Sequence, residues 1–300
     1  MRKEAETVLR KEKIEFMDLI PIGHHKLNRN YVFLVKKEKD LILKFYGKKV
    51  KYLCEKRALE ILRTFVEVPR LKAFGENDRL PWILMNRIEG DLLQDIWHSI
   101  SQESRIHLLR TMGELLGRLH SEQTLNYFGL WKDFRRTTPY KDFIKYRKEN
   151  DNRVMAKIRN QNLPDKELFE QAYGELKKLY TYLDPDIKGA ICHRDYSFRN
   201  VLVMDEKNRK KINGLIDFEH CQIDDPAIDF NTLYQHDMLN SRVMEKAFFD
   251  GYEKHMTRSE DFIDRKKYYM INLGLHTCSW SYNKAKDFYN SGIKLLKSVL

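Results

Sequence analysis

The chain carries two short segments whose residue types and spacing suit phosphoryl transfer, HRDYSFRN at residues 193–200 and GLIDFEH around Asp217. Transfer from a nucleotide needs a carboxylate that orients and deprotonates the attacking hydroxyl, oxygen ligands that hold magnesium, and a cation that fixes the phosphates. Asp195 suits the first role, as catalytic base, and Asn200 and Asp217 suit the second, as Mg²⁺ ligands. The alternative is that Asp195 and Asn200 are ordinary turn residues and Asp217 a cap.

Apolar runs flank both segments. Residues 190–192 lead into the first segment and residues 201–204 follow Asn200, while a charged turn at 205–211 precedes a second apolar run that ends before Asp217. This pattern is typical of loop, strand, turn and strand. Both metal-ligand candidates are therefore predicted at strand ends that face one loop.

HRDYSFRNVLV together with GLIDFEHCQIDDPAIDF resembles the catalytic core of the aminoglycoside phosphotransferase and choline kinase superfamily, most closely over residues 190–230. The resemblance implies an α+β, protein-kinase-like fold and a small-molecule kinase that uses ATP or GTP. It also implies that His193 stabilises the catalytic loop and that Asp229 braces it. Arg194, Phe198 and Arg199 depart from the pattern of many relatives, and the last two residues could alter the choice of acceptor.

Lys44 is the candidate for the phosphate-binding cation. The sequence YVFLV, KKEKD and LILKFY predicts a hairpin, and side chains alternate along a strand, so Lys44 leaves the apolar layer of Leu43 and Phe45. Glu55 borders the apolar stripe of a helix predicted at residues 50–65, which makes it the partner of Lys44, as the resemblance also implies. The alternative is that Glu55 is a surface acid with a helical neighbour.

Three further positions concern the nucleotide. A strand-like segment from Leu19 continues into a loop that resembles the nucleotide-covering loop of kinases, although it carries only Gly23. Residues 85–90 end an apolar strand with polar residues and a glycine, as a linker between lobes should. In the resembling family, backbone groups of this linker bind the adenine edge, which places that contact near Asn86 to Ile88. No Walker-type phosphate loop is present in the sequence.

These elements predict two lobes. Residues 1–86 form an N-terminal nucleotide-binding lobe with an antiparallel sheet and a helix, and residues 87–300 form a larger, mainly helical lobe that carries catalysis and acceptor binding. An amphipathic helix is predicted at residues 4–16 and a long helix at residues 101–121. His120, at the end of that long helix, is expected to be structural rather than catalytic.

Composition narrows the function. The net charge is +11, and residues 1–86 hold 20 Lys or Arg against 12 Asp or Glu. A positive field there would attract a nucleotide, although a solvated basic surface is an equal explanation. Nucleic acid is not an expected partner, because no recognised binding motif accompanies the scattered charges. Four cysteines lie far apart, which disfavours structural zinc and a disulfide scaffold.

The apolar runs are too short to cross a bilayer, and the charged start is unlike a signal peptide, so a cytoplasmic protein without membrane association is expected. The oligomeric state is not predicted. In place of the glycine of protein kinases, Glu219 follows Asp217 and Phe218, and Asp229 comes twelve residues after Asp217, which leaves no room for a long activation segment. This favours a small acceptor over a peptide.

The partners are therefore a nucleotide and a small polar acceptor: an aminoglycoside, an amino alcohol or a sugar. A cationic aminosugar would need acids near Asp195, and the candidates are Asp133, Asp142, Glu149, Glu260, Asp261 and Asp264, each of which could instead cover an exposed helix. A protein Ser/Thr kinase and a non-catalytic nucleotide-binding scaffold are the alternatives.

Overall fold

The structure is a computed structural model. It describes residues 1–23, 30–77, 79–131, 140–207, 209–235, 238–239, 241–258 and 262–300. The chain divides into two compact units, residues 1–108 with 197–221 and residues 109–196 with 222–300. The sequence predicts a division at residue 86 into a nucleotide-binding lobe and a catalytic lobe. That division is defined by ligand binding, and it stays a prediction.

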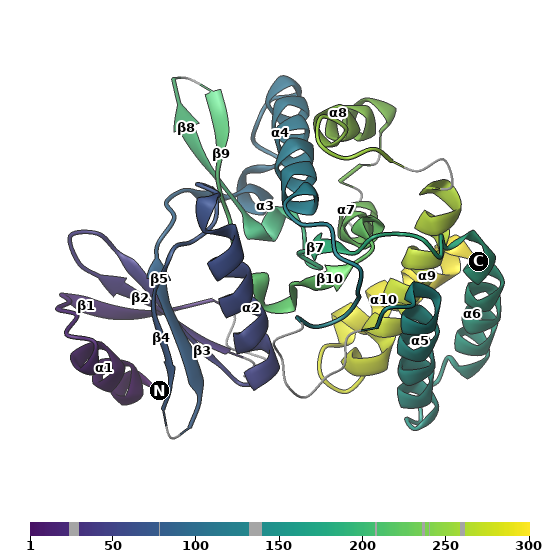
Figure 1. The fold of residues 1–300 in the computed structure, drawn as a ribbon, viewed down its shortest axis with the longest axis horizontal. Coiled ribbons are helices and arrows are strands. Elements are labelled where there is room, and N and C mark those ends of the chain that lie inside the picture. The colour runs from purple at the N-terminus through teal and green to yellow at the C-terminus, as the bar shows by residue number, and fades with distance from the viewer. Residues whose placement is uncertain are drawn as a thin grey trace. The chain divides into compact units, whose positions relative to one another are not determined.

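The first unit is built on a five-stranded antiparallel sheet with the strand order β1-β2-β3-β5-β4. Figure 1 shows this sheet beside the N-terminal helix. Its strands are β1 (Asp18–Ile22), β2 (Asn30–Lys36), β3 (Leu41–Tyr46), β4 (Leu71–Glu76) and β5 (Pro81–Asn86). The predicted hairpin is present, with Val32 opposite Lys44. The predicted antiparallel N-terminal sheet is therefore confirmed.

Two helices cover the two faces of this sheet, α1 (Arg2–Lys11) and α2 (Lys49–Ile61). Ala5, Val8 and Leu9 of α1 pack in one core with Leu43 and Phe45. Because side chains alternate along β3, Lys44 projects to the opposite face, where α2 carries Glu55. The alternation that buries the core thus delivers one charged side chain to α2.

A three-stranded sheet in the order β6-β8-β9 completes the first unit, formed by β6 (Asp91–Leu92), β8 (Val201–Glu206) and β9 (Arg209–Leu215). The short helix α3 (Leu93–Ile96) follows β6. The linker side chain Ile88 lies so close to Gly214 that a Cβ there would come within 2.7 Å of it. Residues 87–92 are therefore fixed against the β8–β9 hairpin.

The second unit is mainly helical, as predicted. Its two-stranded sheet pairs β7 (Ala190–Cys192) with β10 (Gln222–Asp224). In Figure 1, α9 lies against α5 and α10. The helices are α4 (Gln102–Ser121), which begins in the first unit, α5 (Phe143–Arg159), α6 (Lys166–Lys178), α7 (Asn231–Gln235), α8 (Arg242–Tyr252), α9 (Phe262–Ser281) and α10 (Lys286–Val299).

The opening helix differs from its prediction. It was expected at residues 4–16 but ends at Lys11, and Lys13 has a φ of 55°, which a right-handed helix cannot include. The remainder of the segment leads into β1. In the part of the chain that the structure describes, no helix is both long and apolar enough to span a membrane.

Candidate active site

Lys44 lies at the centre of a buried charge cluster in the first unit. The residue is 6% exposed, and its Nζ atom donates to Glu55 Oε2 and to Asp217 Oδ1, each at 2.7 Å. Tyr46 donates its hydroxyl to the same Glu55 oxygen at 2.7 Å, and the backbone N–H of Phe218 donates to Glu55 Oε1 at 3.3 Å. The predicted pairing of Lys44 with Glu55 is therefore present.

Glu219 is a third carboxylate of this cluster, which the sequence reasoning did not include among the site residues. One of its oxygens lies 3.2 Å from Lys44 Nζ, and its carboxylate also accepts hydrogen bonds from Lys51 and Asn30. The available signal was its position two residues after Asp217 in the sequence DFE. An acid so close to a candidate metal ligand adds an oxygen donor to the same site.

The cluster holds three carboxylates, those of Glu55, Asp217 and Glu219, against the two ammonium groups of Lys44 and Lys51. Burial alone would lower the pKa of Lys44, but the attraction of the three carboxylates outweighs it and holds that pKa well above the ordinary lysine value. Burial raises the pKa of Glu55 against the pull of Lys44. When all five groups are ionised, the cluster carries one surplus negative charge, which favours a cation.

Glu219 gives this cluster a pH dependence. Burial would raise its pKa, but Lys44 and Lys51 outweigh burial, so the pKa is lowered below the ordinary glutamate value. A carboxylate with a lowered pKa stabilises the fold above its unfolded pKa of about 4.3, and loses this contribution as pH falls through the lower folded value. Glu219 therefore supports stability at neutral pH and not in strong acid.

We expect Glu219→Gln to lower the free energy of unfolding at pH 7 by about 1–3 kcal/mol, because two ammonium groups lose a charged partner. Urea titrations of both proteins at several pH values measure this difference, which should shrink between pH 5 and pH 3. Glu206→Gln, in an exposed pair with Lys211, is the matched control and should change little. A difference that stays constant down to pH 3 would contradict the assigned charge on Glu219.

The β8–β9 hairpin places Asn200 and Asp217 at its two ends. Val201 pairs with Leu215 at the base of the hairpin, and one step beyond, the N–H of Ile216 donates to the carbonyl of Asn200 at 2.9 Å. The predicted loop, strand, turn and strand are therefore present. Asp217 has a φ of 67° and a ψ of 61°, in the left-handed region that residues other than glycine rarely occupy. Such conformations cluster at functional sites.

Gly23, Asn86 and Ile88 also belong to the first unit, and their nucleotide contacts stay predictions. Gly23 follows β1 with a φ of 87°, and the predicted covering loop continues into residues 24–29, which lie outside the described residues. The N–H of Asn86 donates to Arg70 O at 3.1 Å, so this N–H is already used within the fold. Ile88 packs on Gly214, as described above.

The segment from His193 to Asp195 belongs to the second unit and is held through its backbone. Asp229, 1% exposed, accepts hydrogen bonds from the N–H of His193 at 2.7 Å and from the N–H of Arg194 at 2.5 Å. His120 Nε2 lies 3.0 Å from the same carboxylate. Asp229 thus contacts the backbone of this segment and the ring of His120, while the bracing role of Asp229 and the structural role of His120 stay predictions. His193 is fully buried and Asp195 is half-buried.

Asp229→Asn tests this bracing. We expect the free energy of unfolding to fall by about 1.5–3 kcal/mol, because the amide replaces a charged acceptor with one neutral oxygen and an NH₂ group that faces backbone donors. Thermal and urea unfolding measure the loss. Asp250→Asn, in an exposed pair with Lys246 on α8, is the control. Equal stability of the two variants would show that Asp229 does not hold the loop.

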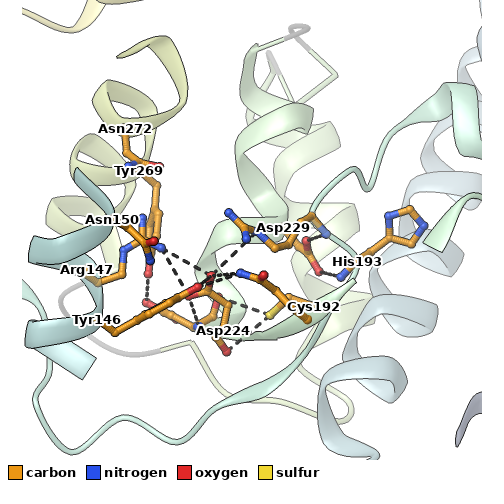
Figure 2. A network of polar contacts seen from close by, with 12 residues as sticks. Tyr146, Arg147, Asn150, Cys192, His193, Asp224, Asp229, Tyr269 and Asn272 are labelled. Carbon is orange, nitrogen blue, oxygen red and sulfur yellow. Dashed lines mark hydrogen bonds and ion pairs between the residues drawn. The ribbon is translucent and has the colours of Figure 1, made fainter. Parts of the chain in front are cut away.

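A second polar network lies behind the same segment, centred on Asp224. This fully buried carboxylate accepts from the hydroxyl of Tyr146 at 3.1 Å and from Arg147 Nη1 at 3.4 Å. Figure 2 shows Asp224 between these α5 side chains and the residues Cys192 and His193. Arg194 Nε lies 3.8 Å from the same carboxylate. Burial and the charge of Asp224 raise the pKa of Tyr146 above the ordinary tyrosine value, so its hydroxyl remains a donor.

The acids considered for a cationic acceptor fall into two groups. Asp133, Glu260 and Asp261 lie outside the described residues. Asp142 caps α5 by accepting from the N–H of Lys145, and Glu149 accepts from the hydroxyl of Tyr140. Asp264 is exposed in the first turn of α9. The described acids are therefore engaged in local contacts or exposed to solvent.

Comparison with known proteins identifies the fold and the family. Three solved structures share the fold at low sequence identity, and their similarity establishes the fold alone. A thermostable mutant of aminoglycoside phosphotransferase APH(4)-Ia, in ternary complex with AMP-PNP and hygromycin B, is 15% identical, with a TM-score of 0.73 over 98% of both chains. The gentamicin complex of APH(2")-IIa is 16% identical, with a TM-score of 0.68 over 98% of this chain and 95% of that chain.

The GDP complex of wild-type aminoglycoside 2'-phosphotransferase-IIIa is 15% identical, with a TM-score of 0.65 over 99% of this chain and 97% of that chain. No curated protein matches the sequence. The predicted protein-kinase-like fold is thus confirmed. The model of the phosphotransferase enzyme family matches residues 18–262, which include Lys44, Asp195 and Asp217. The chain is therefore a member of the phosphotransferase enzyme family.

Proposed function

We propose that this protein is a magnesium-dependent kinase that transfers the γ-phosphoryl group of ATP or GTP to a hydroxyl of a small polar acceptor. The observation that carries the proposal is the contact of the buried Lys44 with both Glu55 and Asp217. A lysine fixed by a helical glutamate, beside a carboxylate that can hold metal, is the arrangement that protein-kinase-like phosphotransfer requires.

The first unit would bind the donor. Lys44 would contact the phosphates, and Asn200 and Asp217 would hold magnesium, with Glu219 as a further oxygen donor. This donor set fits the metal, because carboxylate and amide oxygens are the ligands that hard divalent cations prefer. One oxygen each from Glu55, Asp217 and Glu219 lie within 4.8 Å of one another. Bound magnesium would neutralise charge on the phosphates. Gly23 and the backbone near Asn86 and Ile88 would contact the rest of the nucleotide.

The second unit would supply the base. Asp195 would orient the acceptor hydroxyl and take its proton as the oxygen attacks the γ-phosphorus. The backbone of the neighbouring His193 and Arg194 is bound to Asp229, so the loop needs little rearrangement before reaction. Positioning of this kind is the main contribution that a protein makes to phosphoryl transfer.

A small acceptor is supported by the segment between Asp217 and Asp229. Its residues form the short helix Phe218–His220, the strand β10 and the start of the short helix Pro226–Phe230. Of the eleven residues between Asp217 and Asp229, all but Cys221 and Asp225 belong to one of these short elements, so no long segment remains for docking a peptide. The proposal therefore favours a metabolite or an aminoglycoside over a protein substrate, and a cytoplasmic location, where nucleotides are abundant.

A transfer assay with radiolabelled ATP and GTP tests the function. The acceptor panel contains aminoglycosides, amino alcohols, sugars and a generic protein substrate. We expect magnesium-dependent labelling of a small acceptor and no labelling of the protein. Labelling of the protein substrate would indicate a protein kinase. Nucleotide binding without transfer to any acceptor would indicate a non-catalytic scaffold.

A further inference from the structure

The second unit contains a pocket that the site described above does not use. Its volume is about 310 Å³ and it is lined from α5, from the segment after β7 and from α9. Its polar lining includes the side chains of Arg147, Asn150, Arg153, Lys157, Arg194 and Asn272. A pocket of this volume can hold a small polar molecule of the size of a monosaccharide.

The lining of this pocket is cationic. Arg147, Arg153, Lys157 and Arg194 are positively charged side chains, and none of the described residues that line the pocket is an Asp or a Glu. Three of these residues, Arg147, Arg153 and Lys157, lie on α5, while Arg194 comes from the segment that follows β7. Four cationic residues from two separate parts of the chain therefore line one small volume.

Two buried carboxylates stand behind this surface and offset part of its charge. Asp224 faces two guanidinium groups, with Arg147 Nη1 at 3.4 Å and Arg194 Nε at 3.8 Å. Asp151 accepts from Asn272 Nδ2 and from the hydroxyl of Tyr268, both at 2.6 Å. Two carboxylates against four cations leave a positive surplus, and a pocket with such a surplus attracts anions.

The pocket is also held in place. Arg147 is 1% exposed, its Nε atom donates to the hydroxyl of Tyr268 at 2.9 Å, and its guanidinium lies 5.1 Å from the ring centre of Tyr269. These contacts fix the planar group before any ligand binds. Arg194 immediately precedes the proposed base Asp195 in the same fixed loop, where its backbone has a φ of 62°. The pocket therefore adjoins the segment that would act on the acceptor.

We propose that this pocket binds a carboxylate or phosphate group of the acceptor, so that the substrate is an anionic hydroxyl compound and not a cationic aminosugar. Arginine and lysine bind both anions through charge-assisted hydrogen bonds. That the bound anion is the phosphoryl acceptor rests on the proposed function, whereas anion binding itself rests on the pocket alone. A polycationic ligand would meet like charges at all four side chains.

Four matched hexoses test the charge preference: glucuronate, glucose 6-phosphate, glucose and glucosamine. Isothermal titration calorimetry of the whole protein measures their binding without nucleotide. We expect glucuronate or glucose 6-phosphate to bind at least about tenfold more tightly than glucose, and glucosamine to bind more weakly still. The comparison of the two anions distinguishes a carboxylate from a phosphate ligand.

The double variant Arg153→Gln with Lys157→Gln removes two exposed charges from the pocket. We expect it to remove most of the preference for the anionic hexose, whereas Lys145→Gln, on the same helix but outside the lining, should leave it unchanged. The proposal is overturned if glucose or glucosamine binds as tightly as the anionic hexoses or more tightly. It is also overturned if neither anion binds, or if the double variant keeps the preference for the anion.

Transfer assays separate this inference from the proposed function. Magnesium-dependent transfer to a cationic or neutral acceptor would overturn the anionic acceptor while it supports the kinase. Tight anion binding that is lost in the double variant, without transfer to any acceptor, would support the pocket and contradict the kinase.

Discussion

Asp195→Ala is expected to lower kcat by about 10²- to 10⁴-fold, which is the range that a general base contributes. As the proposed base, Asp195 would act on the acceptor hydroxyl, so the variant should bind nucleotide and magnesium as the unchanged protein does. Single-turnover transfer and a separate nucleotide titration measure the two properties. Because Asp229 holds the backbone of the preceding residues, the loop should keep its conformation when the Asp195 side chain is removed.

Asp186→Ala is the matched control for this substitution. Asp186 is an exposed aspartate ahead of β7 in the same unit, and its replacement should leave both kcat and nucleotide affinity unchanged. If Asp195→Ala turns over as fast as this control, Asp195 is not the base. If Asp195→Ala loses nucleotide affinity to the same extent as it loses kcat, the Asp195 side chain instead supports the fold.

Asp217→Asn is expected to lower kcat by about 10²- to 10³-fold, since one charged ligand of the metal becomes neutral. The substitution also removes the surplus negative charge of the cluster around Lys44. Nucleotide titrations with and without magnesium should show a metal-dependent gain in affinity for the unchanged protein and little or none for the variant. Lys44 keeps Glu55 and Glu219 as partners, so we expect the variant to fold.

Asp205→Asn serves as the control for the metal experiment. Asp205 lies on the same β8–β9 hairpin and pairs with Lys210 at its exposed end. Its replacement should leave the metal dependence of nucleotide binding intact. If Asp217→Asn shows the same metal dependence as this control, Asp217 does not hold the metal.

Local sequence patterns were sufficient to predict the strand, the helix and the hairpin that carry or flank Lys44, Glu55 and Asp217. Alternation along LILKFY determines which face of β3 carries Lys44, and the apolar stripe of α2 places Glu55 at the edge of the buried face. The apolar runs on either side of residues 205–211 predicted the β8–β9 hairpin. Each of these inferences uses neighbours within one strand, one helix or one hairpin, where periodicity is informative.

The basic pocket could not be predicted in this way. Arg147 and Asp224 are 77 residues apart, and Arg147 and Tyr268 are 121 residues apart, so their contacts depend on how α5, β10 and α9 pack. From the sequence alone, Arg153 and Lys157 are ordinary charges of an exposed helix face. Glu219 was missed for a similar reason: its contact with Lys51 joins residues 168 apart in the sequence, so the periodicity of one element does not reveal it.

The β8–β9 hairpin has a consequence for recognising distant relatives. A hairpin lengthens or shortens at its tip by adding or removing residues in both strands, while the pairing of Val201 with Leu215 at its base is undisturbed. The number of residues between Asn200 and Asp217, the two proposed metal ligands, can therefore change without moving them apart at the base of the hairpin. A search that fixes this spacing will overlook homologues, whereas one that requires only paired strands ending in Asn and Asp will retain them.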